Sequence, residues 1–262
     1  MRIAKKSLGQ NFLIDKNIIK KIVNLAQIKN RNIIEIGSGT GALTEEILRR
    51  KPKSLTIIEK DRNLLNDLLI KFSENGILKS KNTDILKLNI ENLVQKNSII
   101  FGNLPYNISS QILVKLVKFE KWPPNYSDLI LMFQKELAEK ILGKYKTRSY
   151  SRLSILTNLR LKIIKRFNVS ANCFKPRPKV VSTLLHFRPI RAKQVNFKDI
   201  SNLEKITNIL FSNKRKMINK NIKKILNSKQ INKIVGLNLN ARPSDLSPEI
   251  YYKITEHYEK KN

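Results

Sequence analysis

Three acidic residues and a glycine-rich turn lie where successive strands are predicted to end. The turn Glu35-Ile-Gly37-Ser-Gly39-Thr-Gly41 closes one apolar run, Glu59 ends a second, and Asp84 follows a third, weaker run. Ligands of open α/β sheets bind at the carboxyl ends of strands, where glycines let them approach the backbone closely. Glu59 could accept both hydroxyl protons of a ribose, and Asp84 could accept from an adenine amino group. Together these residues predict a site for an adenosine.

The glycine pattern alone does not identify the ligand. The spacing Gly37-x-Gly39-x-x-Ala42 also satisfies the dinucleotide fingerprint, and a plain tight turn would use the same glycines. Glu59 and Asp61 could instead cap the helix that is predicted to follow them. These residues therefore leave NAD and S-adenosylmethionine both open as cofactors.

The segment after the fourth strand candidate, at 98–101, favours S-adenosylmethionine. Asn103-Leu104-Pro105-Tyr106 presents an amide, a carbonyl and an aromatic face, in a turn that proline makes rigid. The exocyclic amine of adenine is a poor nucleophile because its lone pair is delocalised into the ring. If the Asn103 side-chain oxygen and the Leu104 carbonyl each accept one N–H, the nitrogen is pushed toward tetrahedral geometry and its lone pair can face a methyl group. Tyr106 would stack on the base, a contact worth about 1–3 kcal/mol.

Short apolar runs alternate with helical patterns over the first 190 residues. Strands are expected at 33–36, 55–58, 98–101, 129–133, 162–165 and 183–187, with a weak one before Asp84, and helices at 17–28, 42–48 and 64–72. This alternation implies parallel strands with helices on both faces. No clear helix separates the last two strands, so an antiparallel partner is expected at the sheet edge. The predicted fold class is α/β with an open, Rossmann-like sheet.

The positive charge is concentrated in the second half of the chain. The 262 residues include 52 Lys and Arg against 20 Asp and Glu, a net charge of +32, of which residues 1–139 contribute +9 and residues 140–262 contribute +23. No acidic residue occurs at 140–198 or at 205–244. Codon bias would enrich lysine but would not by itself empty two long stretches of carboxylates. Nucleic acid is therefore the expected partner, and a membrane surface is the weaker alternative.

The rest of the composition excludes several classes of protein. A single cysteine, Cys173, allows no intramolecular disulfide, and two histidines are too few for a His-rich metal centre, so no metal site is expected. No apolar stretch has the length of a signal peptide or a membrane span. We expect a cytoplasmic, monomeric enzyme.

Eight segments, in order along almost the whole chain, resemble the small-subunit ribosomal RNA adenine dimethyltransferase family (KsgA type). They are Lys6–Asp15, Glu35–Thr44, Ile58–Asp61, Gly102–Ser109, Phe133–Glu136, Tyr150–Ser154, Phe174–Ser182 and Leu246–Pro248. Gly-Gln-Asn-Phe-Leu at 9–13 and Asn-Leu-Pro-Tyr-Asn-Ile at 103–108 are the specific pieces, whereas the glycine loop is generic to methyltransferases.

The resemblance implies a class I S-adenosylmethionine-dependent methyltransferase domain at 1–190 and a small helical RNA-docking domain at 191–262. It implies that Asn11 and Leu13 close over the methionine side of the cofactor and that Phe174 adds a second aromatic face for the adenine. The expected cofactor-binding residues are Asn11, Leu13, Glu35, Gly37, Gly39, Glu59, Asp84 and Asn103. The expected catalytic residues are Asn103, Leu104, Tyr106 and Phe174.

The same resemblance indicates the substrate. The family dimethylates two adjacent adenosines near the 3′ end of small-subunit (16S) rRNA in an assembling 30S subunit. The predicted RNA contacts in the C-terminal domain are Lys214, Arg215, Lys216, Lys220, Lys223 and Lys224. Two alternatives stay open at this point: methylation of large-subunit rRNA, and a non-catalytic RNA-binding assembly factor that keeps a cofactor pocket.

Overall fold

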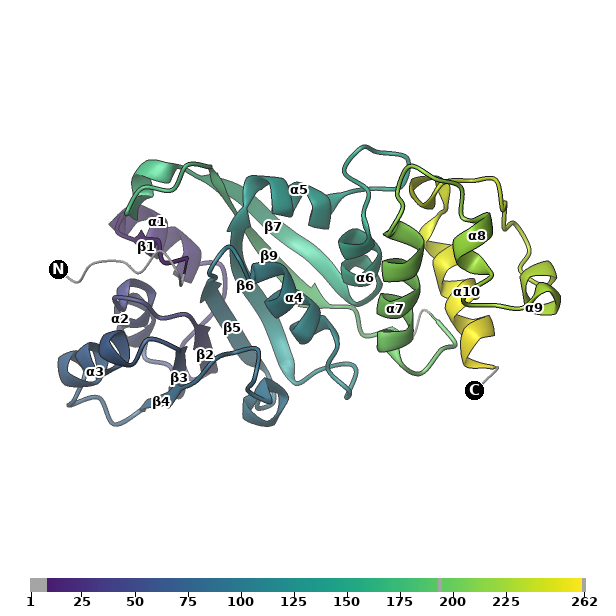
Figure 1. The fold of residues 1–262 in the computed structure, drawn as a ribbon. Coiled ribbons are helices and arrows are strands. Elements are labelled where there is room, and N and C mark those ends of the chain that lie inside the picture. The colour runs from purple at the N-terminus through teal and green to yellow at the C-terminus, as the bar shows by residue number, and fades with distance from the viewer. Residues whose placement is uncertain (1–8, 193–194, 261–262) are drawn as a thin grey trace. The chain divides into compact units, whose positions relative to one another are not determined.

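The computed structural model describes residues 9–192 and 195–260, and within them the chain forms two compact units. The sheet unit comprises the described residues up to Ala138 together with Leu161–Ile190. The helical unit comprises Glu139–Arg160 and the described residues from Arg191 onward (Figure 1). Residues 139–160 therefore group with the C-terminal helices, which the single predicted boundary at residue 190 does not anticipate.

A seven-stranded sheet of order β4-β3-β2-β5-β6-β9-β7 forms the first unit. In chain order its strands are β2 (Asn32–Ile36), β3 (Ser54–Glu59), β4 (Leu78–Asn82), β5 (Ser98–Asn103), β6 (Tyr126–Gln134), β7 (Leu161–Val169) and β9 (Ser182–Pro189). β9 runs antiparallel to both β6 and β7, and the remaining pairs are parallel. The antiparallel edge expected from the missing crossover helix is thus present.

Helices cover the sheet because its strands are apolar on both faces. α1 (Lys16–Val23), α2 (Ala42–Arg49) and α3 (Arg62–Lys71) bury their apolar stripes in one core with residues from β2, β3, β5, β6 and β9. α4 (Ser109–Val117) lies over the other face in Figure 1. Asp15 caps α1 and Asp61 caps α3, each accepting hydrogen bonds from backbone N–H groups of the first turn.

The helical unit contains α6 (Arg152–Arg160), α7 (Ile200–Phe211), α8 (Asn219–Ile222), α9 (Ser228–Asn232) and α10 (Pro248–Glu259), and the chain enters it within α5 (Lys135–Leu142). α7 packs against both α6 and α10, and the ring of Phe211 stacks on that of Tyr251. Short 3-10 helices span Ile90–Leu93, Ala171–Cys173 and Pro243–Asp245. None of the helices in the described residues is long and apolar enough to span a bilayer.

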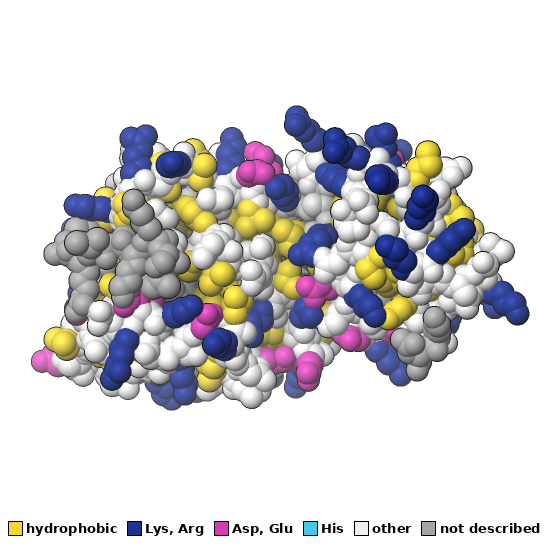
Figure 2. Space-filling model, viewed as in Figure 1, with side chains coloured by type: hydrophobic (Ala, Val, Ile, Leu, Met, Phe, Trp, Pro, Cys, Tyr) yellow, Lys and Arg dark blue, Asp and Glu magenta, His cyan; other side chains and the backbone are white. Residues whose placement is uncertain are grey.

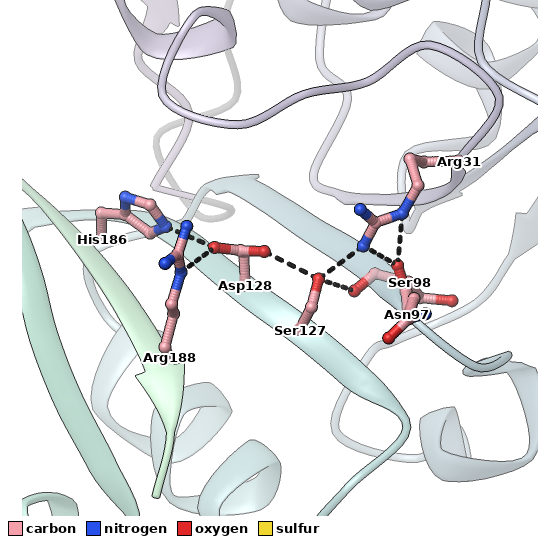
Figure 3. Close-up of polar contacts among 7 residues, drawn as sticks. All are labelled: Arg31, Asn97, Ser98, Ser127, Asp128, His186 and Arg188. Atoms are coloured by element: carbon pink, nitrogen blue, oxygen red, sulfur yellow. Dashed lines mark hydrogen bonds and ion pairs between the residues drawn. The ribbon is translucent and has the colours of Figure 1, made fainter.

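A polar network around the buried side chains of Asp128 and His186 lies at the amino ends of the parallel strands (Figure 3). The Asp128 carboxylate is central: its Oδ1 lies 2.8 Å from both His186 Nε2 and Arg188 Nε, and its Oδ2 accepts from Ser127 Oγ at 2.7 Å. Ser127 in turn accepts from Arg31 Nη2 at 2.7 Å, and Arg31 also donates to the Asn97 carbonyl. The network links the residues directly before β2 and β5 to β6 and β9, at the end of the sheet opposite to the predicted site.

Candidate active site

A cavity opens at the carboxyl ends of β2 and β5, the neighbouring strands at which the order of the sheet reverses. This is the position where open α/β sheets bind their ligands. All eight predicted cofactor-binding residues line it, and so do Leu104 and Tyr106. Phe174 does not, and the six predicted RNA contacts lie in the helical unit.

The backbone of the glycine turn after β2 allows a ligand to approach it closely. Gly37, Gly39 and Gly41 all have positive φ, between 55° and 81°, which side chains disfavour. A Cβ on Gly39 would lie 3.0 Å from the ring of Phe12, so a larger residue would require that ring to move. Between the glycines, the hydroxyl of Ser38 is buried and has no hydrogen-bond partner among the described residues. A buried hydroxyl without a partner costs stability unless a ligand completes it.

Glu59 and Glu35 place two buried carboxyl groups beside this turn. Glu59 Oε2 accepts from Gly39 N at 2.9 Å and Oε1 accepts from Asp61 N at 2.9 Å, which fixes the carboxylate at the end of β3. Burial raises the pKa of Glu59 despite these bonds. Burial also raises the pKa of Glu35 to about 8, although Thr44 Oγ1 donates to it at 2.6 Å. Glu35 is therefore mostly protonated at neutral pH.

Asp84 is held differently, at the more exposed rim of the cavity. Its Oδ1 accepts from Leu86 N at 2.9 Å, and its Oδ2 forms an ion pair with Lys60 Nζ at 3.0 Å. The backbone hydrogen bond, followed by the bond from Lys60, lowers the pKa of Asp84 below its usual range. Asp84 is thus a fixed, charged acceptor of hydrogen bonds.

The Asn103 amide is oriented by the N-terminal segment. Its Nδ2 donates to the Asn11 carbonyl at 2.9 Å, which leaves the side-chain oxygen as the acceptor that this amide offers to a ligand. Leu104 is buried and Tyr106 is half-buried. The turn therefore holds the amide and the ring against the same cavity.

Phe174 lies behind the cavity wall. The short strand β1 (Phe12–Leu13) pairs antiparallel with β8 (Phe174–Lys175), and Leu13 is the register partner of Phe174. Phe174 is only 3% exposed and packs in the main apolar core with Leu13. The fold brings the predicted aromatic face next to the cofactor-closing strand but does not expose it, so its contact with a base stays a prediction.

The side chains that line the cavity suit the functional groups of S-adenosylmethionine. Glu59 can accept from ribose hydroxyls and Asp84 from an adenine amine. The orphaned hydroxyl of Ser38 and the cradle under Phe12 provide a further hydrogen bond and the space for a ligand.

The predicted RNA contacts are all exposed, as their charge requires. Lys214, Arg215 and Lys216 lie in the turn after α7, and the other three lysines lie in or just after α8. Ile218, Ile222 and Ile225 are buried, which directs the lysines of this segment to solvent. Figure 2 shows Lys and Arg side chains spread over the helical unit on the face drawn. Their contact with RNA is not tested by this geometry and stays a prediction.

Four residues of the site were not singled out from the sequence. Phe12 stands between Asn11 and Leu13, and Lys60 directly follows Glu59, so adjacency was an available signal. Ser38 sits inside the glycine turn. Ser182, whose hydroxyl contacts Tyr106, ends the family-like segment Phe174–Ser182, but it lies 76 residues from Tyr106 and no local spacing connects the two. The family-like segment at 6–15 begins at Lys6, and its residues 6–8 lie outside the described residues.

The strand order and the cavity define a class I S-adenosylmethionine-dependent methyltransferase, and comparison with known proteins narrows this class. The model of the family "Ribosomal RNA adenine dimethylase" matches residues 1–260. The chain belongs to this family of rRNA adenine dimethyltransferases, whose methyl donor is S-adenosylmethionine. The NAD alternative is thereby excluded.

Individual relatives and a solved structure agree with this assignment. "Ribosomal RNA small subunit methyltransferase A" of Pelagibacter ubique is 42% identical and covers 98% of this chain and 97% of its own length. The protein of the same name from Malacoplasma penetrans is 37% identical, with 96% and 90% covered. A dimethyladenosine transferase from Plasmodium falciparum superposes with a TM-score of 0.75 at 26% identity, covering 95% of this chain and 98% of that one.

Proposed function

We propose that this enzyme dimethylates the exocyclic amines of two adjacent adenosines near the 3′ end of small-subunit (16S) rRNA during assembly of the 30S subunit. Relatives named for the small subunit, at 42% and 37% identity over nearly the whole chain, support the choice of RNA. The observation that carries the chemistry is the Asn103 amide, held by the Asn11 carbonyl beside the cavity. We further propose that the enzyme acts as a monomer in the cytoplasm.

The chain's own residues perform the orientation that the reaction needs. The Asn103 side-chain oxygen and the Leu104 carbonyl accept the two N–H hydrogens of the adenine amine, which turns the nitrogen lone pair out of the ring plane. Tyr106 stacks on the base and holds it in that position. S-adenosylmethionine held by residues such as Glu59 and Asp84 would supply an electrophilic methyl carbon, so that the amine nitrogen would gain the methyl group that the sulfur loses and would release one proton to water. Holding both reactants in place contributes up to about 7–11 kcal/mol.

The substrate assignment is tested on the RNA itself. Small-subunit and large-subunit rRNA are isolated from cells with and without the gene, digested, and analysed for dimethyladenosine by mass spectrometry and primer extension. We expect dimethyladenosine to disappear from the 3′ region of the small-subunit rRNA only. Loss restricted to the large subunit would contradict the proposal. If no modification is lost and titration calorimetry detects no binding of S-adenosylmethionine, the non-catalytic alternative is correct.

The basic segment at 214–224 gives a separate prediction. Replacing Lys214, Arg215 and Lys216 together by alanine should lower the affinity for RNA and reduce the slope of log K against log salt by about 0.7–0.9 for each phosphate that is no longer neutralised. Binding of S-adenosylmethionine should not change. The matched control is the triple substitution of Lys79, Lys81 and Lys87 by alanine, which removes the same charge from the sheet unit. Equal salt slopes in the two variants would show that this segment does not contact phosphates.

A further inference from the structure

Ser182 is a buried polar residue that the proposed reaction does not use. It is the first residue of β9, is fully buried, and pairs with Gln134 of β6 on one side and with Val169 of β7 on the other. Its backbone is therefore held by the sheet from both sides. A side chain at this position is attached to one of the most rigid parts of the sheet unit.

The hydroxyl of Ser182 lies 2.6 Å from the hydroxyl of Tyr106, a hydrogen-bond distance. The other end of Tyr106 is also held, because Ser109 Oγ donates to its carbonyl oxygen at 3.1 Å. Burial raises the pKa of the Tyr106 phenol, so it remains a neutral hydroxyl at physiological pH. The ring is thus fixed at its backbone and at its tip, while its flank lines the cavity.

We propose that Ser182 is a positioning residue for methyl transfer, which fixes the position of the Tyr106 ring against which the target adenine stacks. This inference rests on the proposed function and extends it to a residue that touches neither substrate nor cofactor. A ring held only by its backbone can rotate about two side-chain bonds, and each rotation moves the stacked base relative to Asn103. The bond to Ser182 fixes the tip of the ring and so restricts rotation about the Cα–Cβ bond, which is the rotation that displaces the whole ring.

The consequence falls on the rate of the chemical step. RNA affinity is set largely by phosphate contacts, whereas the alignment of the amine with Asn103 depends on where the base stacks. Loss of the tether should therefore lower kcat and leave the KM for RNA and the affinity for S-adenosylmethionine within about twofold. Removal of a single neutral hydrogen bond corresponds to a change of about 3- to 10-fold.

The bond can be broken from either end, which separates positioning from stability. Ser182→Ala removes the hydroxyl on the sheet, and Tyr106→Phe removes the hydroxyl on the ring without touching the sheet. Each should lower kcat about 3- to 10-fold on undermethylated small subunits, and the double variant should be no slower than the slower single variant. Thr183→Val is the matched control, since Thr183 is also buried in β9 but bonds to Asn168 at 2.9 Å, and it should leave kcat unchanged.

Three outcomes would overturn the inference: unchanged kcat in Ser182→Ala, effects of the two substitutions that multiply, or an equal loss of kcat in Thr183→Val. The first two mean that the bond does not act through the Tyr106 ring, and the third means that the loss reflects the stability of β9. Failure of the proposed function is distinguishable, because then the parent enzyme itself would not methylate small subunits in the same assay.

Discussion

Buried carboxyl groups at the two ends of the sheet differ in their partners and in the direction of their pKa shifts. At the carboxyl ends of the strands, burial raises the pKa of Glu35 to about 8 and also raises that of Glu59. At the amino ends, burial would raise the pKa of Asp128 too, but bonds from His186, Arg188 and Ser127 together outweigh it and hold that pKa well below its usual range. At the carboxyl ends, a ligand can supply hydrogen-bond partners that the described residues do not supply, as for the Ser38 hydroxyl. At the amino ends, Asp128 already has its hydrogen-bond partners within the protein.

The difference separates a functional polar cluster from a structural one. Incomplete hydrogen bonding and raised pKa values cost stability, and they are retained where a ligand provides the compensation. A fully paired cluster stabilises the fold and offers nothing to a ligand. Substitutions at the cavity should therefore affect catalysis or the alkaline side of the stability curve, and substitutions in the network of Figure 3 should affect stability on the acid side.

The largest effect is expected at Asn103. Asn103→Ala removes the acceptor for the adenine amine, and loss of one such orienting hydrogen bond typically lowers the rate about 10²–10³-fold. Single-turnover methylation of undermethylated small subunits measures the loss, and calorimetry should show that S-adenosylmethionine still binds. Asn66→Ala, at an exposed position of α3 outside the cavity, is the control. Unchanged turnover in Asn103→Ala would refute the mechanism.

Substitution of Glu35 tests how the raised pKa at the carboxyl ends affects the free energy of unfolding at alkaline pH. A carboxyl group whose folded pKa is raised contributes stability that is fully present below the unfolded value of 4.5 and is lost as the pH rises through about 8. Glu35→Gln cannot ionise, so the free energy of unfolding of the parent should fall relative to this variant by on the order of 3 kcal/mol between pH 5 and pH 8. Urea denaturation at several pH values measures it.

The control for this experiment is Glu45→Gln, since the pKa of Glu45 is lowered by its hydrogen bond from Lys71. Between pH 5 and pH 8 its curve should run parallel to that of the parent. Parallel curves for Glu35→Gln and the parent would mean that Glu35 is ionised in the folded protein, and the two ends of the sheet would then not differ as described.

Substitution of Asp128 tests how the network at the amino ends affects the free energy of unfolding at acid pH, and the expected change is smaller. Asp128→Asn keeps the shape but removes the charge that His186 and Arg188 share, and should cost about 2 kcal/mol of unfolding free energy at neutral pH. Because the folded pKa of Asp128 is lowered, its contribution is present above the unfolded pKa and disappears as the pH falls through the folded one. The variant and parent should converge in acid, as measured by urea denaturation. A loss of cofactor binding in Asp128→Asn would show that the network also serves the site.

Much of the sheet unit could be predicted because its signals are local. The apolar runs that became β2, β3, β5, β6 and β9 are buried on both faces, so each is nearly continuous in the sequence. β4 and β7 lie at the sheet edges and carry polar residues, which explains why the strand at 78–82 left only a weak signal and why β7 extends to 161–169 rather than 162–165. The buried polar partner of His186 could not be read from the sequence, since Asp128 lies 58 residues away.

The candidate site was predictable to the extent that its residues end strands. Glu35, Glu59 and Asn103 end neighbouring strands, so topology alone brings them together. The pairing of β1 with β8 and the contact of Tyr106 with Ser182 depend on tertiary packing and have no counterpart in local spacing. Residues 139–160 form helices that bury apolar side chains in the helical unit, which the composition of that stretch did not indicate.

The pairing of β1 with β8 also constrains the order in which parts of the enzyme can fold during synthesis. Its two strands are about 160 residues apart, and the one that emerges first on synthesis directly follows Asn11, whose carbonyl orients Asn103. A nascent chain that ends before residue 174 can form most of the sheet, but its strand β1 lacks the partner strand β8. Contacts of such long sequence separation form late. Competence for methylation should therefore be acquired in one of the last folding events, after the parallel strands have docked.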